Sequence, residues 1–124
     1  MLEVRNIHAG YGALSVLRGI DMQIAEGEVV AVLGSNGVGK TTLLKSLMGV
    51  VSIKSGSVVL GEQDLTKASP YERARAGVGY VPQGREIFAR LTVEENLLMG
   101  LATQPGGTPI PAELFELFPV LKQI

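Results

Sequence analysis

The sequence predicts an α/β fold, and three features of its first half indicate it. Residues 2–7 alternate in side-chain character as in a half-buried β-strand. Residues 28–33 form a nearly continuous apolar run, which is typical of a strand buried on both faces. This run leads into a glycine-rich segment, residues 34–41, after which apolar residues recur at helical spacing. We therefore expect an antiparallel β portion followed by a strand, a loop and a helix.

The antiparallel β portion is expected to contain two strands joined by a short turn. The alternation over residues 2–7 ends at Tyr11-Gly12, a pair that favours a turn. Residues 16–24 are predicted to form the second strand. Glu26-Gly27 then provides a tight turn before the apolar run.

Two helices and two short strands are predicted for the middle of the chain. From Lys40, leucine and methionine recur on one helical face, and Gly49 provides a stop signal. Residues 58–60 are expected to form a short strand, and residues 70–76 a helix that begins with proline. Residues 78–81 are predicted to form another short strand.

The last third of the chain is predicted to hold helices on either side of a loop. Thr92 can accept a hydrogen bond from the backbone of Glu95, and the Glu95 side chain can reach back. A helix should therefore begin there and run to Met99. Residues 103–111 are rich in glycine and proline and should form a loop, and the apolar helical face beyond it is interrupted at Pro119.

Composition limits the function classes that are open to the chain. Its 124 residues carry 11 Lys and Arg against 12 Asp and Glu, so no long-range field favours nucleic acid or an acidic membrane. Cysteine is absent, which excludes disulfides and thiolate zinc sites and fits a reducing compartment. No apolar run is long enough to cross a bilayer, and the N-terminus lacks a secretory signal. A cytoplasmic location is expected.

Four arginines in the second half of the chain could suggest a groove for nucleic acid. Acidic residues interleave them, and no series of aromatic residues supplies stacking platforms. A solvated face of mixed charge is therefore expected at Arg73, Arg75, Arg85 and Arg90, with no nucleic-acid partner.

The glycine-rich segment carries the strongest functional motif. The pattern G-x-x-x-x-G-K-[ST] is matched by Gly34-Ser35-Asn36-Gly37-Val38-Gly39-Lys40-Thr41, between a buried-type strand and a helix. In such a P-loop, glycines let successive N–H groups point at phosphate, and the helix N-terminus adds positive potential. Lys40 is expected between the β- and γ-phosphates, the Thr41 hydroxyl on magnesium, and Thr42 on the α-phosphate. The sequence therefore predicts a site for ATP with Mg²⁺.

This P-loop and two further segments resemble the ATP-binding subunits of ABC transporters. Tyr11 stands where that family has an aromatic that stacks on adenine, and Val16 would line the same face. Tyr80-Val81-Pro82-Gln83 resembles the family's Q-loop, whose glutamine reaches magnesium and the attacking water. The resemblance implies catalytic roles for Lys40 and Gln83, with Thr41 and Gln83 at the metal.

The same resemblance implies a fold and a domain organisation. It implies a P-loop NTPase core of the ABC ATPase type with an N-terminal antiparallel β portion. Residues 1–124 would form the N-terminal part of one nucleotide-binding domain, with the Q-loop and the start of a helical subdomain from about residue 83.

Within this family the chain looks most like the importers for branched-chain amino acids and urea. The similarity lies in residues 83–88 and 91–97, and Gly84-Arg85-Glu86-Ile87-Phe88 favours the urea branch. It implies a peripheral subunit on the cytoplasmic face of the inner membrane. Its partners would be a second ATPase subunit, integral permease subunits and, indirectly, a periplasmic solute-binding protein. Those partners select the solute, so urea and branched-chain amino acids both stay open.

The family pattern stops partway through the chain. The LSGGQ-type signature, the Walker B aspartate, the catalytic glutamate and the switch histidine do not occur before Ile124. The 124-residue chain is therefore expected to position ATP but to hydrolyse it negligibly. The alternatives are a catalytically incompetent nucleotide-binding fragment, or a non-transport ABC ATPase acting on DNA repair or ribosomes, whose basic surface and long insertions are not seen.

Two of the site residues also have simpler explanations. Tyr11 can be a turn aromatic packed on the sheet, and Gln83 a solvated loop residue. The P-loop favours adenine stacking for Tyr11, and the Q-loop-like run favours a functional role for Gln83. Phe88 is the candidate for contact with a membrane subunit.

Overall fold

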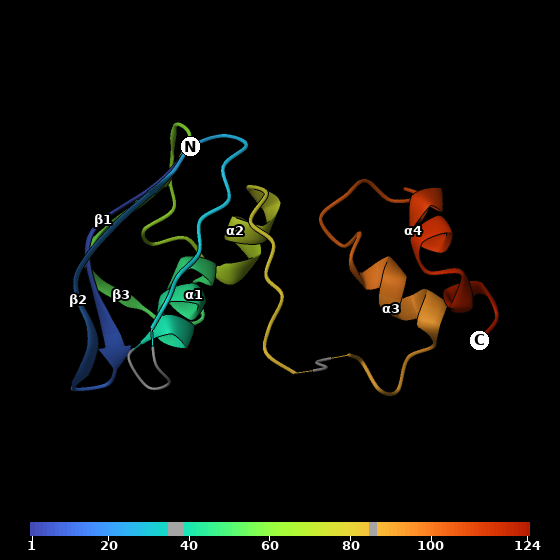
Figure 1. Ribbon diagram of the computed structural model, residues 1–124, viewed down its shortest axis with the longest axis horizontal. Helices are drawn as coiled ribbons and strands as arrows, with labels where there is room; N and C mark the ends of the chain where they lie inside the picture. Colours follow the sequence, from blue (N-terminus) through green and yellow to red (C-terminus); the bar gives the residue numbers. More distant parts are fainter. Residues whose placement is uncertain (35–38, 85–86) are drawn as a thin grey trace. The chain divides into compact units, whose positions relative to one another are not determined.

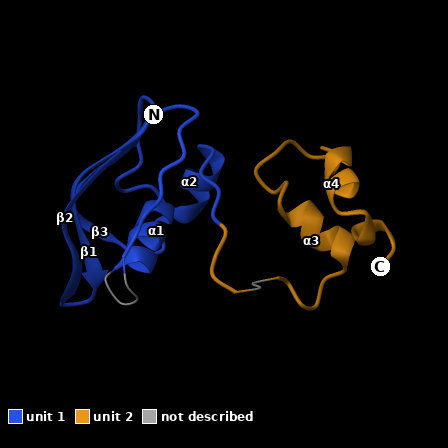
Figure 2. Ribbon diagram, viewed as in Figure 1, with its two compact units in different colours: residues 1–80 blue, residues 81–124 orange. Residues whose placement is uncertain are grey.

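The structure is a computed structural model that describes residues 1–34, 39–84 and 87–124. The chain forms two compact units, Met1–Tyr80 and Val81–Ile124 (Figures 1 and 2). The residues outside the described ranges are Ser35, Asn36, Gly37, Val38, Arg85 and Glu86. Predictions that rest on those side chains stay predictions.

The first unit is built on a four-stranded antiparallel sheet. Its strands are β1 (Leu2–Tyr11), β2 (Leu14–Ile24), β3 (Ile53–Leu60) and β4 (Gln63–Asp64), in the order β2-β1-β3-β4. Leu2 of β1 lies opposite Ile24 on one side and Leu60 on the other. The expected antiparallel portion is confirmed, and it is larger than predicted because β3 and β4 join it.

A bulge in β1 changes which of its residues face the core. The register between β1 and β2 shifts between Val4 and Ile7, and Asn6 has a left-handed backbone with φ 47°. Val4 and Ile7 are therefore both buried, whereas strict alternation would have placed Asn6 on the side of Val4. Gly56 on β3 makes room for the bulge, since a Cβ there would lie 2.3 Å from the carbonyl oxygen of Asn6.

The core of this unit lies between the sheet and helix α1 (Lys40–Met48) (Figure 1). Gly39 precedes the helix, and Gly49 ends it with a left-handed backbone whose N–H donates to the carbonyls of Lys45 and Ser46. The helix predicted from Lys40 and its stop at Gly49 are both confirmed. The buried apolar residues are Val4, Ile7, Ala9, Leu17, Leu43, Val51, Val58 and Leu65.

Helix α2 (Pro70–Arg75) closes the first unit beside α1. The hydroxyl of Ser69 accepts from the N–H of Glu72 at 3.1 Å, and the Glu72 carboxylate accepts from the N–H of Ser69 at 3.4 Å. This capping box satisfies two backbone donors at the start of the helix. The predicted helix over residues 70–76 is confirmed with a C-cap at Ala76.

The two strands expected at residues 28–33 and 78–81 are wrong. Both segments run as irregular chain, and no described strand is hydrogen-bonded to either of them (Figure 1). Val29 is 96% exposed and Leu33 is 89% exposed. An apolar run favours a strand, but a strand forms only where a neighbouring chain pairs with it. Each apolar run predicts a buried strand, but none of the described strands pairs with it.

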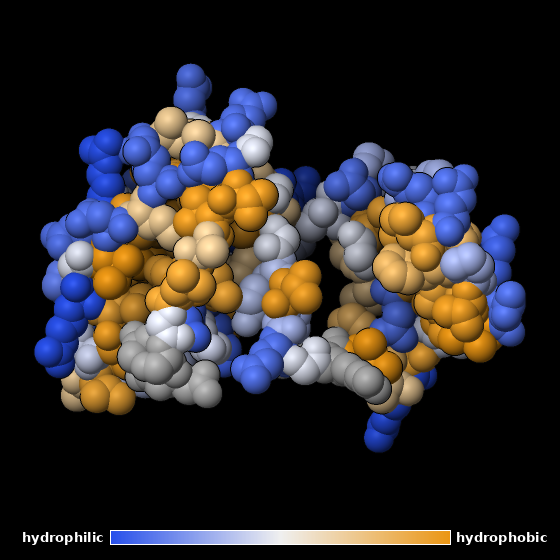
Figure 3. Space-filling view, in the orientation of Figure 1, coloured by the Kyte–Doolittle hydropathy of each residue, from blue (hydrophilic) through white to orange (hydrophobic). Residues whose placement is uncertain are grey.

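The second unit contains helix α3 (Val93–Met99), helix α4 (Ala112–Leu117) and the 3₁₀ helix η1 (Pro119–Lys122). Thr92 and Glu95 form the predicted capping box, with the Glu95 N–H donating to the Thr92 hydroxyl at 3.1 Å. The loop over residues 103–111 and the break at Pro119 are confirmed as well. Apolar side chains are exposed on both units (Figure 3), and Phe88, Leu117 and Phe118 are among them in the second.

Two classes of feature are absent from the part of the chain that the structure describes. No helix there combines the length and the hydropathy that a bilayer span requires. The described residues also contain no group of three or more His, Cys, Asp or Glu side chains placed to hold a metal ion.

Candidate functional site

The described part of the P-loop motif consists of its two ends. Gly34 is the first residue of the motif, and Lys40 begins α1 at its other end. The Lys40 ammonium donates a hydrogen bond to the carbonyl oxygen of Gly34. The cationic group thus lies between the two ends of the motif, where a phosphate held by such a loop needs a counter-charge.

Gly39 joins the loop to α1 in a backbone conformation that favours glycine. Its φ is 100°, and a Cβ at this position would lie 3.2 Å from Cδ2 of Leu17 and 3.3 Å from Cγ1 of Val16. The start of α1 therefore packs closely against β2. The structure places Val16 beside this glycine, while its contact with adenine stays a prediction.

Tyr11 and Thr42 meet across the first unit. The Tyr11 hydroxyl lies 3.4 Å from Oγ1 of Thr42, within hydrogen-bond reach. Thr42 is 7% exposed, whereas Tyr11 is 50% exposed. The P-loop motif predicts Thr42 at the nucleotide, and the family resemblance predicts Tyr11 there. The structure brings the two residues together. Thr41, in contrast, is exposed on the first turn of α1.

The residues present fit a magnesium-bound phosphate group. The first turn of α1 holds no acidic residue that would oppose an anion, and α1 is nine residues long. Lys40 offers an ammonium there, and exposed Thr41 offers a hydroxyl oxygen, which is a ligand that Mg²⁺ accepts. This donor set suits a nucleotide polyphosphate with Mg²⁺.

Gln83 lies in the second unit and is exposed. The next residue, Gly84, has φ 86°, so the chain turns sharply after Gln83. The role of Gln83 at magnesium and at the attacking water stays a prediction. Arg85 and Glu86, which follow it, lie outside the described residues.

Arg73 does not belong to a solvated face, which corrects the sequence prediction. It is 2% exposed, and its guanidinium donates to four carbonyl oxygens of the first unit. Burial lowers the pKa of Arg73 from its usual range. The sequence offers only a weak signal for this burial: Arg73 lies three residues before Ala76, the partly buried C-cap of α2, so the two residues share one face.

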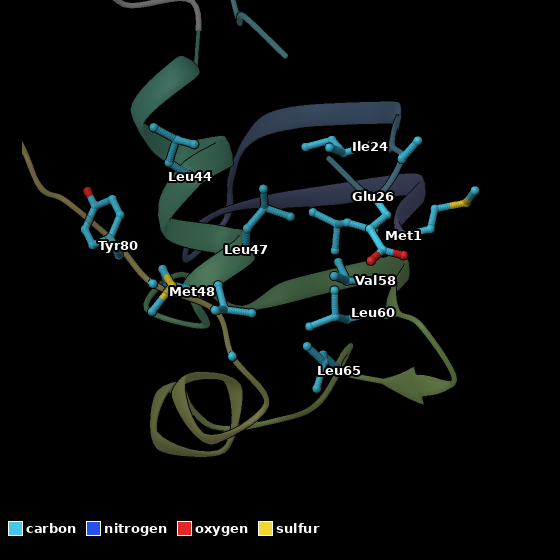
Figure 4. A pocket seen from close by; sticks show the side chains of 15 residues that line it. Met1, Ile24, Glu26, Leu44, Leu47, Met48, Val58, Leu60, Leu65 and Tyr80 are labelled. Carbon is cyan, nitrogen blue, oxygen red and sulfur yellow. The ribbon is translucent and has the colours of Figure 1, made fainter. Parts of the chain in front are cut away.

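An apolar pocket of about 400 Å³ lies apart from the P-loop residues, between the later part of α1 and the sheet (Figure 4). Leu44, Leu47 and Met48 line it from α1, and Val58 and Leu60 from β3. Among the described residues that line it, Glu26 is the only one with a charged side chain. The pocket therefore lacks the cationic donors that a phosphate requires, and we do not assign the nucleotide to it.

The P-loop, the sheet and α1 agree with a known family. A family model described as "ABC transporter" matches residues 17–122. The chain belongs to the ABC transporter family. The matched range includes the P-loop, the part of the first unit from residue 17 onward and most of the second unit.

Two curated relatives illustrate the range of names within this family. The probable branched-chain amino acid transport ATP-binding protein LivF of Archaeoglobus fulgidus is 42% identical over 103 residues, which are 83% of this chain and 44% of that protein. The sulfate/thiosulfate import ATP-binding protein CysA of Methylococcus capsulatus is 40% identical over 110 residues, 89% of this chain and 31% of that protein. The chain thus spans less than half the length of either ABC relative.

A solved ABC structure supports the fold. The structure titled "Structure of ATP binding subunit of ABC transporter" superposes with a TM-score of 0.77 at 30% identity. The match covers 98% of this chain and 49% of that chain. The P-loop NTPase fold of the ABC ATPases, expected from the sequence, is thereby confirmed for this portion.

Proposed function

We propose that the P-loop of this chain binds ATP with Mg²⁺. The observation that carries the proposal is the position of the Lys40 ammonium, which bonds to the Gly34 carbonyl across the two ends of the motif. Lys40 would bind the β- and γ-phosphates, and exposed Thr41 would hold Mg²⁺. Bound ATP would supply a phosphoryl group whose transfer to water releases free energy.

The residues around Lys40 would orient the nucleotide. Tyr11 is half exposed, and its ring would stack on adenine beside Val16. Thr42 is buried, and its hydroxyl lies within hydrogen-bond reach of the Tyr11 hydroxyl. If Thr42 binds the α-phosphate, the phosphate would replace Tyr11 as the partner of this hydroxyl. Ser35, Asn36, Gly37 and Val38 would add backbone N–H donors.

For the whole protein we propose an ATPase subunit of an ABC importer. Gln83 would sense the bound nucleotide, and exposed Phe88 would meet a membrane subunit. Closure of two such subunits on ATP would drive permease subunits fed by a periplasmic binding protein, at the cytoplasmic face of the inner membrane. Domain residues 1–124 would be the first part of this subunit, with its helical subdomain from about residue 83.

We propose a small polar solute as the cargo, either branched-chain amino acids or urea. The name of the Archaeoglobus relative favours branched-chain amino acids. The segment Gly84–Phe88 is the argument for urea. The sulfate relative is almost as similar, at 40% against 42% identity, so overall identity carries little weight in choosing the solute.

Calorimetric titration of the chain with Mg-ATP tests the proposed site. Saturable binding that is lost in Lys40→Ala supports it, and equal affinity in Lys40→Ala and wild type contradicts it. Lys45→Ala is the matched control, because Lys45 lies on the last turn of the same helix.

Steady-state phosphate release by the protein from its native source distinguishes the importer ATPase, which turns ATP over, from the alternative, a nucleotide-binding fragment without turnover. Release catalysed by this chain alone would contradict the expected inactivity. The intact mass of the protein from its native source adds a second criterion. A mass well above 13.1 kDa would support the longer importer subunit.

A further inference from the structure

The guanidinium of Arg73 is surrounded by main-chain carbonyl groups. Its donors reach Ala68 (Nε, 3.0 Å), Ser46 (Nη1, 3.0 Å), Leu47 (Nη1, 2.9 Å) and Thr66 (Nη2, 3.0 Å). In residues 1–34, 39–84 and 87–124 the one ion pair within 4.0 Å joins Arg5 to Glu3. Arg73 therefore acts as a directional donor to carbonyls, not as half of a salt bridge.

Two of these carbonyls belong to the last turn of α1. Ser46 and Leu47 lie where helical carbonyls run out of intrahelical donors. A cation at this end also interacts favourably with the helix dipole. Lys40 and Thr41 lie at the start of this same nine-residue helix. Arg73 therefore bonds to the end of the helix whose first turn belongs to the P-loop.

The turn after α1 leaves space for this guanidinium. A Cβ at Gly49 would lie 2.9 Å from Nε of Arg73 and 3.2 Å from the carbonyl oxygen of Ala68. Gly49 also has φ 83°, the conformation in which glycine is favoured. The helix stop at Gly49 thus admits the Arg73 side chain as well as ending α1.

The main chain of Arg73 makes a second connection. Its carbonyl oxygen accepts from the N–H of Val78 at 3.1 Å, at the start of the segment that leads to Gln83. One residue therefore bonds to the P-loop helix through its side chain and to the chain entering the Q-loop through its backbone.

An apolar side chain would fill this space at lower desolvation cost. Burying a guanidinium without a carboxylate costs free energy that four good hydrogen bonds must offset. The buried guanidinium is therefore better explained by the carbonyl groups that it holds in place than by its packing.

We propose that Arg73 is a positioning residue for the nucleotide site, acting on ATP through α1. It fixes the end of α1 so that the first turn presents Lys40 and Thr41 in one orientation. This inference rests on the proposed binding of Mg-ATP at the P-loop.

The test compares Arg73→Met, Arg73→Lys and Arg75→Met in the full chain. Arg75 lies on the same helix but is exposed, with its guanidinium 2.9 Å from the Tyr71 hydroxyl, so Arg75→Met is the matched control. Two quantities are measured under conditions where circular dichroism shows each variant folded. They are the Kd for Mg-ATP and, without nucleotide, hydrogen exchange at Leu43, whose N–H donates to Gly39 at 2.8 Å.

Arg73→Met is expected to raise the Kd about tenfold and to speed exchange at Leu43 about tenfold. Arg73→Lys keeps the charge and three donors, so it should recover part of both losses. Arg75→Met should change neither quantity by more than about twofold. If Arg73→Met does not fold, Arg73→Lys is compared with Arg75→Lys on the same measurements.

Two outcomes overturn the inference. One is an unchanged Kd in a folded Arg73 variant whose wild type binds Mg-ATP, which would leave Arg73 with a role in stability alone. The other is unchanged exchange at Leu43, which would show that Arg73 does not hold the P-loop end of α1. A wild type that fails to bind Mg-ATP contradicts the proposed function instead, and exchange at Leu43 then decides the role of Arg73 independently.

Discussion

The hydroxyl of Tyr11 lies 3.4 Å from Oγ1 of Thr42, although 31 residues separate them in sequence. The end of β1 is thereby joined to the first turn of the P-loop helix. The ring and the hydroxyl of Tyr11 can be tested separately. Tyr11→Ala should weaken Mg-ATP binding by about 1 to 3 kcal/mol, because it removes a stacking surface.

Tyr11→Phe is the matched variant for that prediction. It keeps the ring and loses only the bond to Thr42, so its Kd for Mg-ATP should stay close to that of wild type. Calorimetry measures both variants. Equal losses in Tyr11→Phe and Tyr11→Ala would mean that the hydroxyl, not the ring, supports the nucleotide.

Lys40→Ala should weaken Mg-ATP binding by at least about 1.5 to 3 kcal/mol, the range for hydrogen bonds to charged groups. The ammonium bonds to the Gly34 carbonyl at the start of the motif, and the substitution removes the cation that would meet the phosphates. Salt should weaken wild-type binding more than Lys40→Ala binding, because one charge pair is lost. Calorimetry at two ionic strengths measures both effects, and an equal salt response would contradict the charge pairing.

Gly39→Ala should destabilise the first unit by about 1 to 3 kcal/mol. The added Cβ would sit 3.2 Å from Leu17 and 3.3 Å from Val16, at a backbone φ of 100° that alanine rarely adopts. Gly79→Ala is the control, since nothing lies within 4 Å of a Cβ there. Urea unfolding monitored by circular dichroism compares the two. Equal free energies of unfolding would show that Gly39 is not constrained as described.

Features that are decided within a few residues could be predicted from the sequence. The capping box at Thr92 and Glu95, the stop at Gly49 and the P-loop motif each depend on neighbours in the chain. The strand expected at residues 28–33 depends instead on a partner strand elsewhere, and an apolar run cannot specify one. The bulge at Asn6 has the same origin, because its register is set against β2 and β3.

The residues of the candidate site divide in the same way, into those that a sequence pattern identifies and those that depend on distant contacts. The motif identified Lys40 and Thr41, and the resemblance to the family identified Tyr11. Arg73 was missed because its acceptors at Ser46 and Leu47 are 27 and 26 residues away in sequence. A charged residue on a short helix predicts exposure unless distant carbonyls converge on it, and no local pattern encodes that convergence.

Asn96 should hold the segment that carries Phe88. Its Oδ1 accepts from the N–H of Phe88 at 2.9 Å, and its Nδ2 donates to the carbonyls of Thr92 at 2.8 Å and Phe88 at 3.1 Å. Asn96→Leu should therefore speed hydrogen exchange at the Phe88 amide, with a local loss of about 1 to 2 kcal/mol. Asn96→Asp keeps the acceptor but not the donors, so its effect should be intermediate. Unchanged exchange in Asn96→Leu would contradict this role.

The stability of the first unit should fall at acid pH partly because of Asp64. The hydroxyl of Thr66 donates to the Asp64 carboxylate at 2.6 Å, and the Thr66 N–H donates at 2.9 Å. These bonds lower the pKa of Asp64 from its ordinary 3.8. A lowered pKa stabilises the folded state above the unfolded pKa, and the contribution is lost as pH falls through the folded value.

Nuclear magnetic resonance titration of the Asp64 carboxyl checks this direction. Thr66→Val should raise the pKa of Asp64 toward 3.8, because the hydroxyl bond is the larger cause of the shift. Thr66→Ser keeps a hydroxyl and should keep the pKa low. If Thr66→Val and Thr66→Ser titrate alike, the backbone N–H alone accounts for the shift. Asp64→Asn should then make the free energy of unfolding less dependent on pH below 3.8, since no carboxylate remains there to be protonated.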